Sequence, residues 1–345
     1  MFQVIERLTA DEVWRSAAEL MQGAERATVQ PSRNGLMLEL LHVGMTIRDP
    51  RQRWISSRTP ALNPAFAIAE VIWIMCGRDD AALLNYFNRS LPRFQGKGDR
   101  YHGAYGFRLR RKFAIDQLAR AYSVLRCKPE SRQVVLQIWD SESDLPDDLG
   151  NPANEDIPCN IVAMLKLRDG RLEWTQIMRS NDLYRGLPHN VIQFTCLQEI
   201  VAGWLGASLG SYHHFSDSLH FYESDGMLSH RLGDSKVPLN SDSLALPKEE
   251  SDKVFLQLSD FADFVANGEE TAKRVLQRLV MLDVPQPFRN LAAILAAEGC
   301  RRRQAPEDMN FALRMCGSSA LEYMYSRWLG RFEKRSEATA KLVPG

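Results

Sequence analysis

The chain has 345 residues, of which 45% are hydrophobic and 25% are charged, and its 43 basic and 43 acidic residues leave no formal net charge. This size is enough to bury a large core, in one domain or two. Balanced, scattered charge disfavours duplex nucleic acid and anionic membranes as partners, since both attract a basic surface. No apolar run approaches the roughly eighteen residues of a membrane span, and the first residues lack an apolar signal segment. We therefore expect a cytoplasmic globular protein.

Six cysteines are spread along the chain, at positions 76, 127, 159, 196, 300 and 316. They form no CxxC pair, and no histidine has a spacing typical of a zinc site. The spacing therefore predicts separate thiols, most of them buried, and no metal site. It leaves room for one reactive thiol.

The first part of the chain predicts a helix, a turn, a strand and a second helix. Within residues 1–30, EVWRSAAELMQGAERA has helical periodicity and ends before PSRNG, whose proline, asparagine and glycine favour a turn. The following GLMLELLHVGMTI predicts a strand. Residues 64–76 are apolar almost all round, which is typical of a buried helix, and Asn63 is a candidate for its cap.

The middle of the chain predicts a sheet. Residues 88–105 indicate a loop and residues 115–127 an amphipathic helix, before a strand at residues 131–140 and a long acidic loop that leads to Cys159. NIVAMLKLRDG and RLEWTQIMRS predict a hairpin, because Asp-Gly is a strong turn signal. NVIQFTCLQEIVAGWLG has helical periodicity, and SYHHFSDSLHFYE is strand-like again. Together these segments indicate an α+β fold with a mostly antiparallel sheet.

Beyond about residue 250 the sequence is helical. Four segments have helical periodicity, namely VFLQLSDFADFVANG, ETAKRVLQRLVMLD, FRNLAAILAAEG and SSALEYMYSRWLGRFEKR. We expect a main domain over residues 1–250 and a helical C-terminal extension, residues 251–345, packed on it.

Three motifs follow one another between residues 158 and 222. They are Pro158-Cys159-Asn160, the stretch MRSNDLYRGLPHN that ends at Asn190, and His220-Phe221-Tyr222. In this order they resemble the Pro-Cys-His, Gln-Arg-Ser-x-Asp-x-x-x-Gly-x-Pro-x-Asn and His-x-Tyr patterns of the thymidylate synthase family. Upstream, AEVIWIMCG, GAYGFRLR and PESRQVVLQIWD resemble further family segments, so the resemblance spans about residues 30–225.

The resemblance implies a catalytic domain that transfers a one-carbon unit from 5,10-methylenetetrahydrofolate to C5 of a pyrimidine nucleotide. Carbon 5 of uracil is a poor nucleophile, and addition of a thiolate at C6 turns it into an enolate carbon that can attack. Cys159 matches that thiolate, with a buried structural thiol as the alternative. A free thiol has a pKa near ~8.5, so it needs a nearby cation to ionise at neutral pH. Arg179 matches the family arginine that lies beside the cysteine and binds the nucleotide phosphate.

Five further positions match the family's nucleotide contacts. Asn190 matches the asparagine that binds the N3–H and O4 edge of uracil, and it favours uracil because enzymes of the family acting on cytosine often carry aspartate there. His220 and Tyr222 match the pair that holds the sugar 3′-hydroxyl, while Ser180 and Asp182 fit the phosphate and base contacts. The alternatives are a helix cap for Asn190, core packing for Tyr222, and polar turn residues for Ser180 and Asp182.

Glu70 is a candidate from its own setting, because a carboxylate in an apolar helix is costly unless it is ion-paired or catalytic. It matches the family glutamate that organises water and relays protons at O4 and C5. Tyr105 matches a tyrosine often assigned to deprotonating C5, with packing as the alternative. Arg33 and Arg132 match phosphate contacts, with a solvated surface role as the alternative. The family counterpart of Arg132 reaches across a dimer interface, so a symmetric homodimer is implied.

The chain departs from the family pattern in several places. Asn160 stands where the family usually has histidine, and Gln133 replaces the second arginine of a phosphate-binding pair. Where the family usually has two tryptophans the chain reads SLPRF, with Leu91 and Phe94 roughly at those places. The tail EKRSEATAKLVPG has no counterpart of the family's closing segment. Because methyl formation requires the exclusion of water, a looser lid would yield a hydroxymethyl group instead.

Three functional hypotheses follow from the sequence. The first is a thymidylate synthase that converts dUMP to dTMP, supported by the residues that match around Cys159. The second is a 5-hydroxymethylase acting on dUMP, CMP or dCMP, supported by the missing tryptophans, the tail and Asn160. The third is a non-catalytic nucleotide-binding or interaction protein, suggested by the helical extension and opposed by the retained nucleophile.

Overall fold

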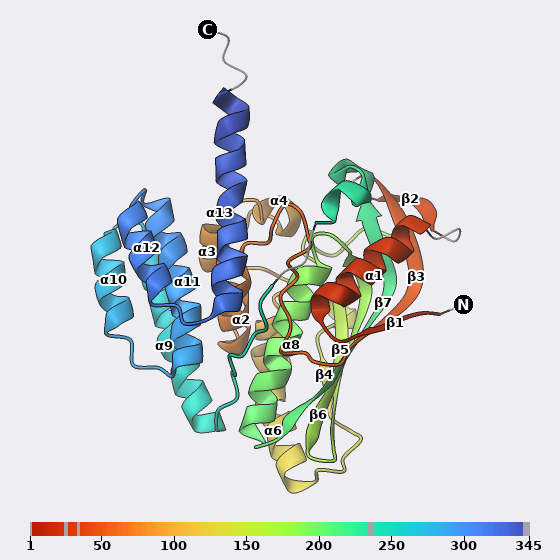
Figure 1. Ribbon diagram of the computed structural model, residues 1–345. Coiled ribbons are helices and arrows are strands. Elements are labelled where there is room, and N and C mark those ends of the chain that lie inside the picture. Colours follow the sequence, from red (N-terminus) through yellow and green to blue (C-terminus); the bar gives the residue numbers. More distant parts are fainter. Residues whose placement is uncertain (1, 24–26, 33–34, 234–236, 341–345) are drawn as a thin grey trace.

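Figure 1 shows the protein as a computed structural model, which describes residues 2–23, 27–32, 35–233 and 237–340. Within these residues one seven-stranded sheet has the strand order β1-β3-β7-β6-β5-β4, with β2 paired to β3. The β1–β3 and β6–β7 pairs are parallel and the other pairs are antiparallel, so the predicted α+β class with a mostly antiparallel sheet is confirmed. The strands are β1 (Gln3–Arg7), β2 (Thr28–Ser32), β3 (Gly35–Ile47), β4 (Val135–Gln137), β5 (Asn160–Arg168), β6 (Arg171–Asp182) and β7 (Ser208–Tyr222).

Helices cover the sheet and extend well beyond it (Figure 1). Helix α8 lies against β6 and β7, α2 packs on α8, and the C-terminal helices α9, α11 and α13 pack on α2. The helices are α1 (Ala10–Gly23), α2 (Pro64–Met75), α3 (Ala81–Phe87), α4 (Pro92–Gln95), α5 (Tyr105–Phe107), α6 (Gln117–Cys127), α7 (Ser141–Asp144), α8 (Leu187–Trp204), α9 (Lys248–Ala266), α10 (Ala272–Val280), α11 (Gln286–Arg302), α12 (Pro306–Arg314) and α13 (Ser319–Ala340).

Helix α2 begins where the sequence predicts. Asn63 caps it, because Asn63 Oδ1 accepts a hydrogen bond from the Phe66 N–H at 3.2 Å, and Pro64 occupies the first turn. The helix is apolar all round because α8 lies on one side of it and the C-terminal helices lie on the other. Every residue of α2 is buried except Glu70, which is half-buried. The helix therefore carries one carboxylate to the edge of an otherwise apolar layer.

The predicted hairpin that follows Cys159 is also confirmed. Strands β5 and β6 pair along their length, and Asp169 and Gly170 between them have φ angles of 49° and 70°. This left-handed conformation is the one that a two-residue hairpin turn requires. The return strand β6 brings Arg179 back to the start of β5, next to Cys159.

Some local predictions for the first 140 residues are wrong. Residues 1–30 contain two strands besides α1, and the proline and serine of PSRNG belong to β2. Strand β1 pairs with β3, far away in the sequence, so its existence depends on a long-range pairing that local periodicity does not reveal. The loop predicted at residues 88–105 contains the short helix α4, and the strand predicted at residues 131–140 is reduced to β4.

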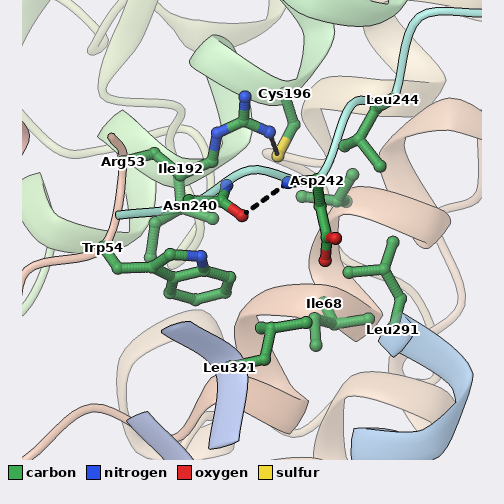
Figure 2. Close-up of a pocket in the computed structure, with 11 residues that line it drawn as sticks. Arg53, Trp54, Ile68, Ile192, Cys196, Asn240, Asp242, Leu244, Leu291 and Leu321 are labelled. Atoms are coloured by element: carbon green, nitrogen blue, oxygen red, sulfur yellow. Dashed lines mark hydrogen bonds between the residues drawn. The ribbon is translucent and has the colours of Figure 1, made fainter. Parts of the chain in front are cut away.

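The C-terminal helices share one hydrophobic core with the rest of the protein. The four predicted segments form α9, α10, α11 and α13, and α12 is an additional helix. Figure 2 shows a small cavity at the junction, lined among others by Arg53, by Cys196 of α8, by Leu291 of α11 and by Leu321 of α13. Arg53 is buried there, where it donates to Cys196 Sγ and forms an ion pair with Glu199. The division of the chain at residue 250 remains a prediction.

The structure also bears on membrane spans, metal sites and cysteines. No helix among the described residues is long and apolar enough to cross a membrane. In the same part of the chain no group of three or more His, Cys, Asp or Glu side chains could hold a metal ion. None of the six cysteines, all of which are described, forms a disulfide, and Cys196, Cys300 and Cys316 are buried.

Candidate active site

Cys159 is half-buried at the end of a long loop, immediately before β5. Arg179 of β6 lies beside it, and the Arg179 N–H donates to the Cys159 carbonyl oxygen at 3.0 Å. The guanidinium donates to the carbonyl oxygens of Pro158 and Ile157 at 3.0 and 3.3 Å, and it lies 5.4 Å from the centre of the Trp139 ring. A permanent positive charge is therefore fixed next to the segment that carries the thiol, which favours a thiolate.

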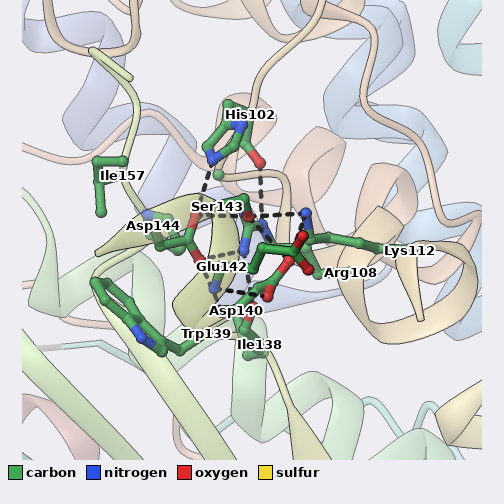
Figure 3. Close-up of polar contacts among 12 residues, drawn as sticks. His102, Arg108, Lys112, Ile138, Trp139, Asp140, Glu142, Ser143, Asp144 and Ile157 are labelled. Atoms are coloured by element: carbon green, nitrogen blue, oxygen red, sulfur yellow. Dashed lines mark hydrogen bonds and ion pairs between the residues drawn. The ribbon is translucent and has the colours of Figure 1, made fainter. Parts of the chain in front are cut away.

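A buried ion pair anchors the loop that leads to Cys159 (Figure 3). The Asp144 carboxylate accepts hydrogen bonds from the two terminal nitrogens of Arg108 at 2.6 and 2.8 Å, and it lies 2.8 Å from His102 Nε2. Burial alone would raise the pKa of Asp144, but the hydrogen bonds from Arg108 hold this pKa below its ordinary value. The loop is thus fixed to the segment that runs into Tyr105.

Two glycines fix the segment around Tyr105. The Gly103 N–H donates to Asp156 Oδ2 at 2.7 Å, which ties this segment to the loop before Cys159. Gly106 lies so close to α2 that a Cβ atom there would come within 2.5 Å of the Ile74 backbone. Only glycine permits this approach. The sequence Gly103-x-Tyr105-Gly106 therefore holds Tyr105 between α2 and the loop.

The Tyr105 hydroxyl shares its surroundings with Cys159 and Glu70. Burial raises the pKa of Tyr105 well above its ordinary value, negative charge on Cys159 and on Glu70 raises it further, and a side-chain hydrogen bond with Asn160 lowers it in part. The Tyr105 ring lies 5.9 Å from the ring of Phe194 on α8. The Tyr105 hydroxyl is therefore within electrostatic reach of both Cys159 and Glu70, and the tyrosine remains protonated in the absence of substrate.

Glu70 lies next to His189, a residue that the sequence did not single out. Glu70 Oε2 is 3.0 Å from His189 Nδ1, and the two side chains are 13% and 17% exposed. Their alignment is not that of a regular hydrogen bond, and neither atom has a hydrogen bond to another described residue. The His189 ring also packs edge-on against Phe66, with ring centres 5.0 Å apart. The sequence signal that could have identified His189 is its position directly before Asn190.

Asn190 is buried in the first turns of α8 and belongs to a chain of buried polar side chains. Asn190 Nδ2 donates to Asn181 Oδ1 at 3.2 Å, and Asn181 Nδ2 lies 2.9 Å from His214 Nε2. His214 Nδ1 lies 3.0 Å from the Tyr212 hydroxyl. Burial lowers the pKa of His214 to about 3, so this imidazole is neutral at pH 7. A neutral imidazole accepts at Nε2 only if Nδ1 carries the proton, which makes the chain directional and orients the Asn190 amide.

Asp182 and His220 are neighbours on the parallel strands β6 and β7. Asp182 Oδ1 accepts hydrogen bonds from the N–H groups of Tyr184 and Arg185 at 2.8 and 2.7 Å, so this aspartate shapes the turn after β6. Burial raises the pKa of Asp182 and lowers the pKa of His220. His220 Nδ1 is buried without a hydrogen-bond partner in the described structure, and its ring lies 5.1 Å from the Tyr222 ring.

Comparison with known families decides the assignment. The family model described as thymidylate synthase matches residues 55–276, which is more than half of the chain. The chain belongs to the thymidylate synthase family. The match covers the segments that hold Glu70, Tyr105, Cys159, Asn190 and His220.

Individual members of the thymidylate synthase family are similar to this chain over part of its length. The deoxyuridylate hydroxymethyltransferase of Bacillus phage SP01 is 35% identical over 198 residues, which are 54% of this chain and 51% of that protein. That of Pseudomonas phage M6 is 36% identical over 163 residues, which are 47% of this chain and 45% of that protein. A protein of Methanothermobacter thermautotrophicus, provisionally named a thymidylate synthase, is 36% identical over 208 residues, 54% of this chain and 87% of that protein. The chain thus spans about half the length of the phage relatives.

The segment at which this member of the thymidylate synthase family lacks two tryptophans lies close to Arg185. Leu91 is buried at the start of α4, whereas Phe94 is 38% exposed. The Arg185 guanidinium lies 5.1 Å from the Phe94 ring and 5.5 Å from the Tyr222 ring, and it pairs with Asp225 at 2.6 Å. A cation between two aromatic rings therefore joins α4 to the end of β7. Arg185 was not predicted from the sequence.

The remaining predicted residues are on β5, on β6, in the segment before β4, and outside the described residues. Ser180 is half-buried on β6 and pairs in register with Ser218 of β7. Arg132 is exposed in the segment before β4. Arg33 lies outside the described residues. Asn160, which replaces the usual histidine of the thymidylate synthase family, is buried and accepts a hydrogen bond from Gln176 Nε2 at 2.8 Å.

Proposed function

We propose that this chain transfers a one-carbon unit to C5 of a pyrimidine nucleoside monophosphate, dUMP, through a covalent bond between Cys159 and C6. The observation that carries the proposal is the position of Cys159 beside Arg179, in a space shared with Tyr105 and Glu70. The thiolate sulfur forms a bond to C6, and the C5–C6 π electrons move toward O4. Carbon 5 can then attack an electrophilic carbon.

A buried polar atom without a partner supports a polar ligand at this place. His220 Nδ1 is buried and has no hydrogen-bond partner among the described residues. Such groups are rare unless a ligand or water completes them. We assign Asn190 to the N3–H and O4 edge of uracil, because its amide offers both an acceptor and a donor. His220 and Tyr222 then hold the sugar hydroxyl.

Proton transfers in this proposal involve Glu70 and Tyr105. The raised pKa of Tyr105 disfavours a phenolate, so its hydroxyl acts as a donor that holds a water molecule, and through this water the C5 proton passes to the Glu70 carboxylate. Glu70 relays protons at O4. Arg179 binds the phosphate through its remaining donors, a role that suits a planar guanidinium.

The one-carbon donor in this proposal is 5,10-methylenetetrahydrofolate, which supplies a carbon at the oxidation level of formaldehyde. The partly exposed Phe94 ring and the neighbouring Leu91 suit the aromatic rings of such a molecule. These two residues of the α4 segment would hold it, next to Arg185 and the end of β7.

We propose the 5-hydroxymethyl nucleotide as the product, with dTMP as the second candidate. The hydroxymethyl product is favoured by the names of the phage relatives, by Leu91 and Phe94 in place of tryptophans, and by the charged Arg185 beside them. The methyl product is favoured by the archaeal relative, which matches over 87% of its own length. The two reactions share the Cys159 step and differ in whether water or hydride meets the new carbon.

The proposal extends to the assembly of the protein. We propose a homodimer in which the exposed Arg132 of one copy contacts the phosphate bound by the other. Residues 251–345 are proposed as a helical extension of a main domain over residues 1–250. The cytoplasmic location, and the absence of nucleic-acid and membrane partners, remain predictions from the sequence.

The function is tested with the purified chain, 5,10-methylenetetrahydrofolate and dUMP, dCMP or CMP tritiated at C5. Release of tritium into water is expected with dUMP and not with dCMP or CMP, because Asn190 fits uracil. Mass spectrometry of the product then distinguishes hydroxymethyl from methyl. If no nucleotide releases tritium, the proposed activity is wrong.

A further inference from the structure

The contact between Glu70 and His189 joins the middle of α2 to the start of α8. Glu70 Oε2 and His189 Nδ1 are 3.0 Å apart, and the side chains are only 13% and 17% exposed. A second histidine–carboxylate contact of the same length, between His42 and Asp217, is 45% and 54% exposed. The two contacts have the same chemistry, but only the first one is removed from bulk water and adjoins the residues around Cys159.

Within the described part of the chain, the two buried atoms have no other partner. Neither Glu70 Oε2 nor His189 Nδ1 forms a hydrogen bond to another described residue, and the edge contact with Phe66 holds the imidazole in place. A buried carboxylate oxygen or ring nitrogen without a hydrogen bond lowers the stability of the folded protein, so each atom is the available partner of the other. Hydrogen bonds between catalytic groups are often poorly aligned in unliganded enzymes and tighten with substrate.

We propose that His189 is a positioning residue for Glu70, an inference that rests on the proposed one-carbon transfer. The Nδ1–H group of His189 donates to Glu70 Oε2 and leaves Oε1 available for proton transfer. From another element, the Tyr105 hydroxyl lies within electrostatic reach of Glu70, and the same hydroxyl is within electrostatic reach of Cys159. The residue after Cys159 is Asn160, so the imidazole in this part of the site comes from His189.

The position of His189 in the sequence adds to this role. His189 and Asn190 are consecutive residues in the first turns of α8, and their side chains have different partners. His189 contacts Glu70, whereas Asn190 donates to Asn181. One turn of one helix therefore positions both the proton-transfer carboxylate and the amide assigned to the base.

Two substitutions of His189 distinguish the packing of its ring from the hydrogen bond that it donates. His189→Phe keeps a ring against Phe66 but cannot donate, and His189→Gln keeps a donor but does not titrate. At saturating dUMP, the rate of tritium release is expected to fall at least roughly tenfold in the phenylalanine variant, because a positioned acid or base contributes about a hundredfold or more. The fall should be smaller in the glutamine variant, which keeps a donor. The dUMP Kd should change by less than about threefold in both, a small free-energy difference.

The pH–rate profile provides a readout that a packing role would not change. The glutamine variant should lose the limb of the profile that the imidazole contributes, whereas His42→Asn, which removes the exposed contact, should leave rate and profile unchanged. In a Glu70→Gln background, His189→Phe should cause no further loss, because a positioning residue acts through its partner. Equal fold losses in both backgrounds, or an unchanged profile in the glutamine variant, would overturn the inference.

A spectroscopic measurement separates this inference from the proposed activity. With ¹⁵N-labelled histidine in the unliganded protein, the His189 Nδ1 resonance should report a bound proton and should shift in Glu70→Gln. The His42 resonance should not shift in that variant, and His189→Gln identifies the signal by its loss. If Glu70→Gln leaves the His189 resonance unmoved, the inference is wrong, whether or not the chain turns over any nucleotide.

Discussion

The main-chain N–H of Arg179 donates to the carbonyl oxygen of Cys159 at 3.0 Å. Because this bond joins β6 to the residue that precedes β5, the sheet itself sets the position of Arg179 relative to Cys159. The guanidinium then reaches back to the carbonyl oxygens of Pro158 and Ile157. The cation is thus held by the same segment whose thiol it is expected to activate.

Arg179→Lys keeps the charge but loses the fork of donors that reaches these carbonyl groups. We expect the dUMP Kd to rise about tenfold or more, equivalent to about 1.4 kcal/mol, and Cys159 to be alkylated more slowly by iodoacetamide at neutral pH. Titration calorimetry and the alkylation rate measure both effects. Arg168→Lys is the control, since Arg168 also donates to carbonyl oxygens but lies at the far end of the hairpin. An unchanged alkylation rate in Arg179→Lys would show that the arginine does not promote ionisation.

Asn181→Leu should weaken the choice between uracil and cytosine. The substitution removes the acceptor of Asn190 Nδ2, so the Asn190 amide can rotate and offer its donor to the unprotonated N3 of cytosine. The ratio of Kd values for dCMP and dUMP should fall about tenfold, the effect of roughly one hydrogen bond. Thr195→Val is the control, because the Thr195 hydroxyl bonds only within α8. A ratio that stays at its wild-type value in Asn181→Leu would refute the orienting role of Asn181.

The buried His214 should make the protein less stable in mild acid. Its pKa in the folded protein is about 3, against about 6.5 in an unfolded chain. Below about pH 6.5 the unfolded chain binds a proton at His214 that the folded protein does not bind, so stability decreases as the pH falls toward 3. His214 should lower the free energy of unfolding by about 2 kcal/mol between pH 7 and pH 5. The His214→Gln variant should not show this decrease. Urea denaturation at both pH values checks this, and equal losses in the two proteins would contradict it.

The buried pair of Arg108 and Asp144 should matter far more than an exposed pair of the same type. Asp144→Asn leaves the fully buried Arg108 without its carboxylate and should cost about 3–5 kcal/mol of stability. Asp79→Asn, which breaks the contact with the exposed Arg100, should cost no more than about 0.5 kcal/mol. Urea denaturation of both variants measures the difference. Similar losses would mean that the loop before Cys159 does not depend on this anchor.

Features that depend on local pattern could be predicted from the sequence. The apolar run around Glu70 predicted its helix, and Asp169-Gly170 predicted the hairpin, since each signal lies within a few residues. Strand β1 was missed because its partner β3 is far away along the chain. The same reason hid the partners of the site: His189 and Glu70 belong to different helices, and their proximity depends on how α2 packs on α8.

The polar chain behind Asn190 could not be predicted for a related reason. Around His214, polar and aromatic residues occur on both faces of β7. The local sequence therefore does not distinguish a buried histidine from an exposed one. Its burial, and its contact with Asn181, arise only when β7 takes its place beside β6.

The central claim is that Cys159 forms the covalent bond on which one-carbon transfer to dUMP depends. Its most direct test compares tritium release from C5-labelled dUMP by the wild-type chain and by Cys159→Ser, with dUMP binding measured in both. The account predicts that the serine variant binds dUMP with a similar Kd and releases no tritium, because a serine hydroxyl is not ionised at neutral pH and cannot add to C6. Tritium release by Cys159→Ser at the wild-type rate would contradict the account.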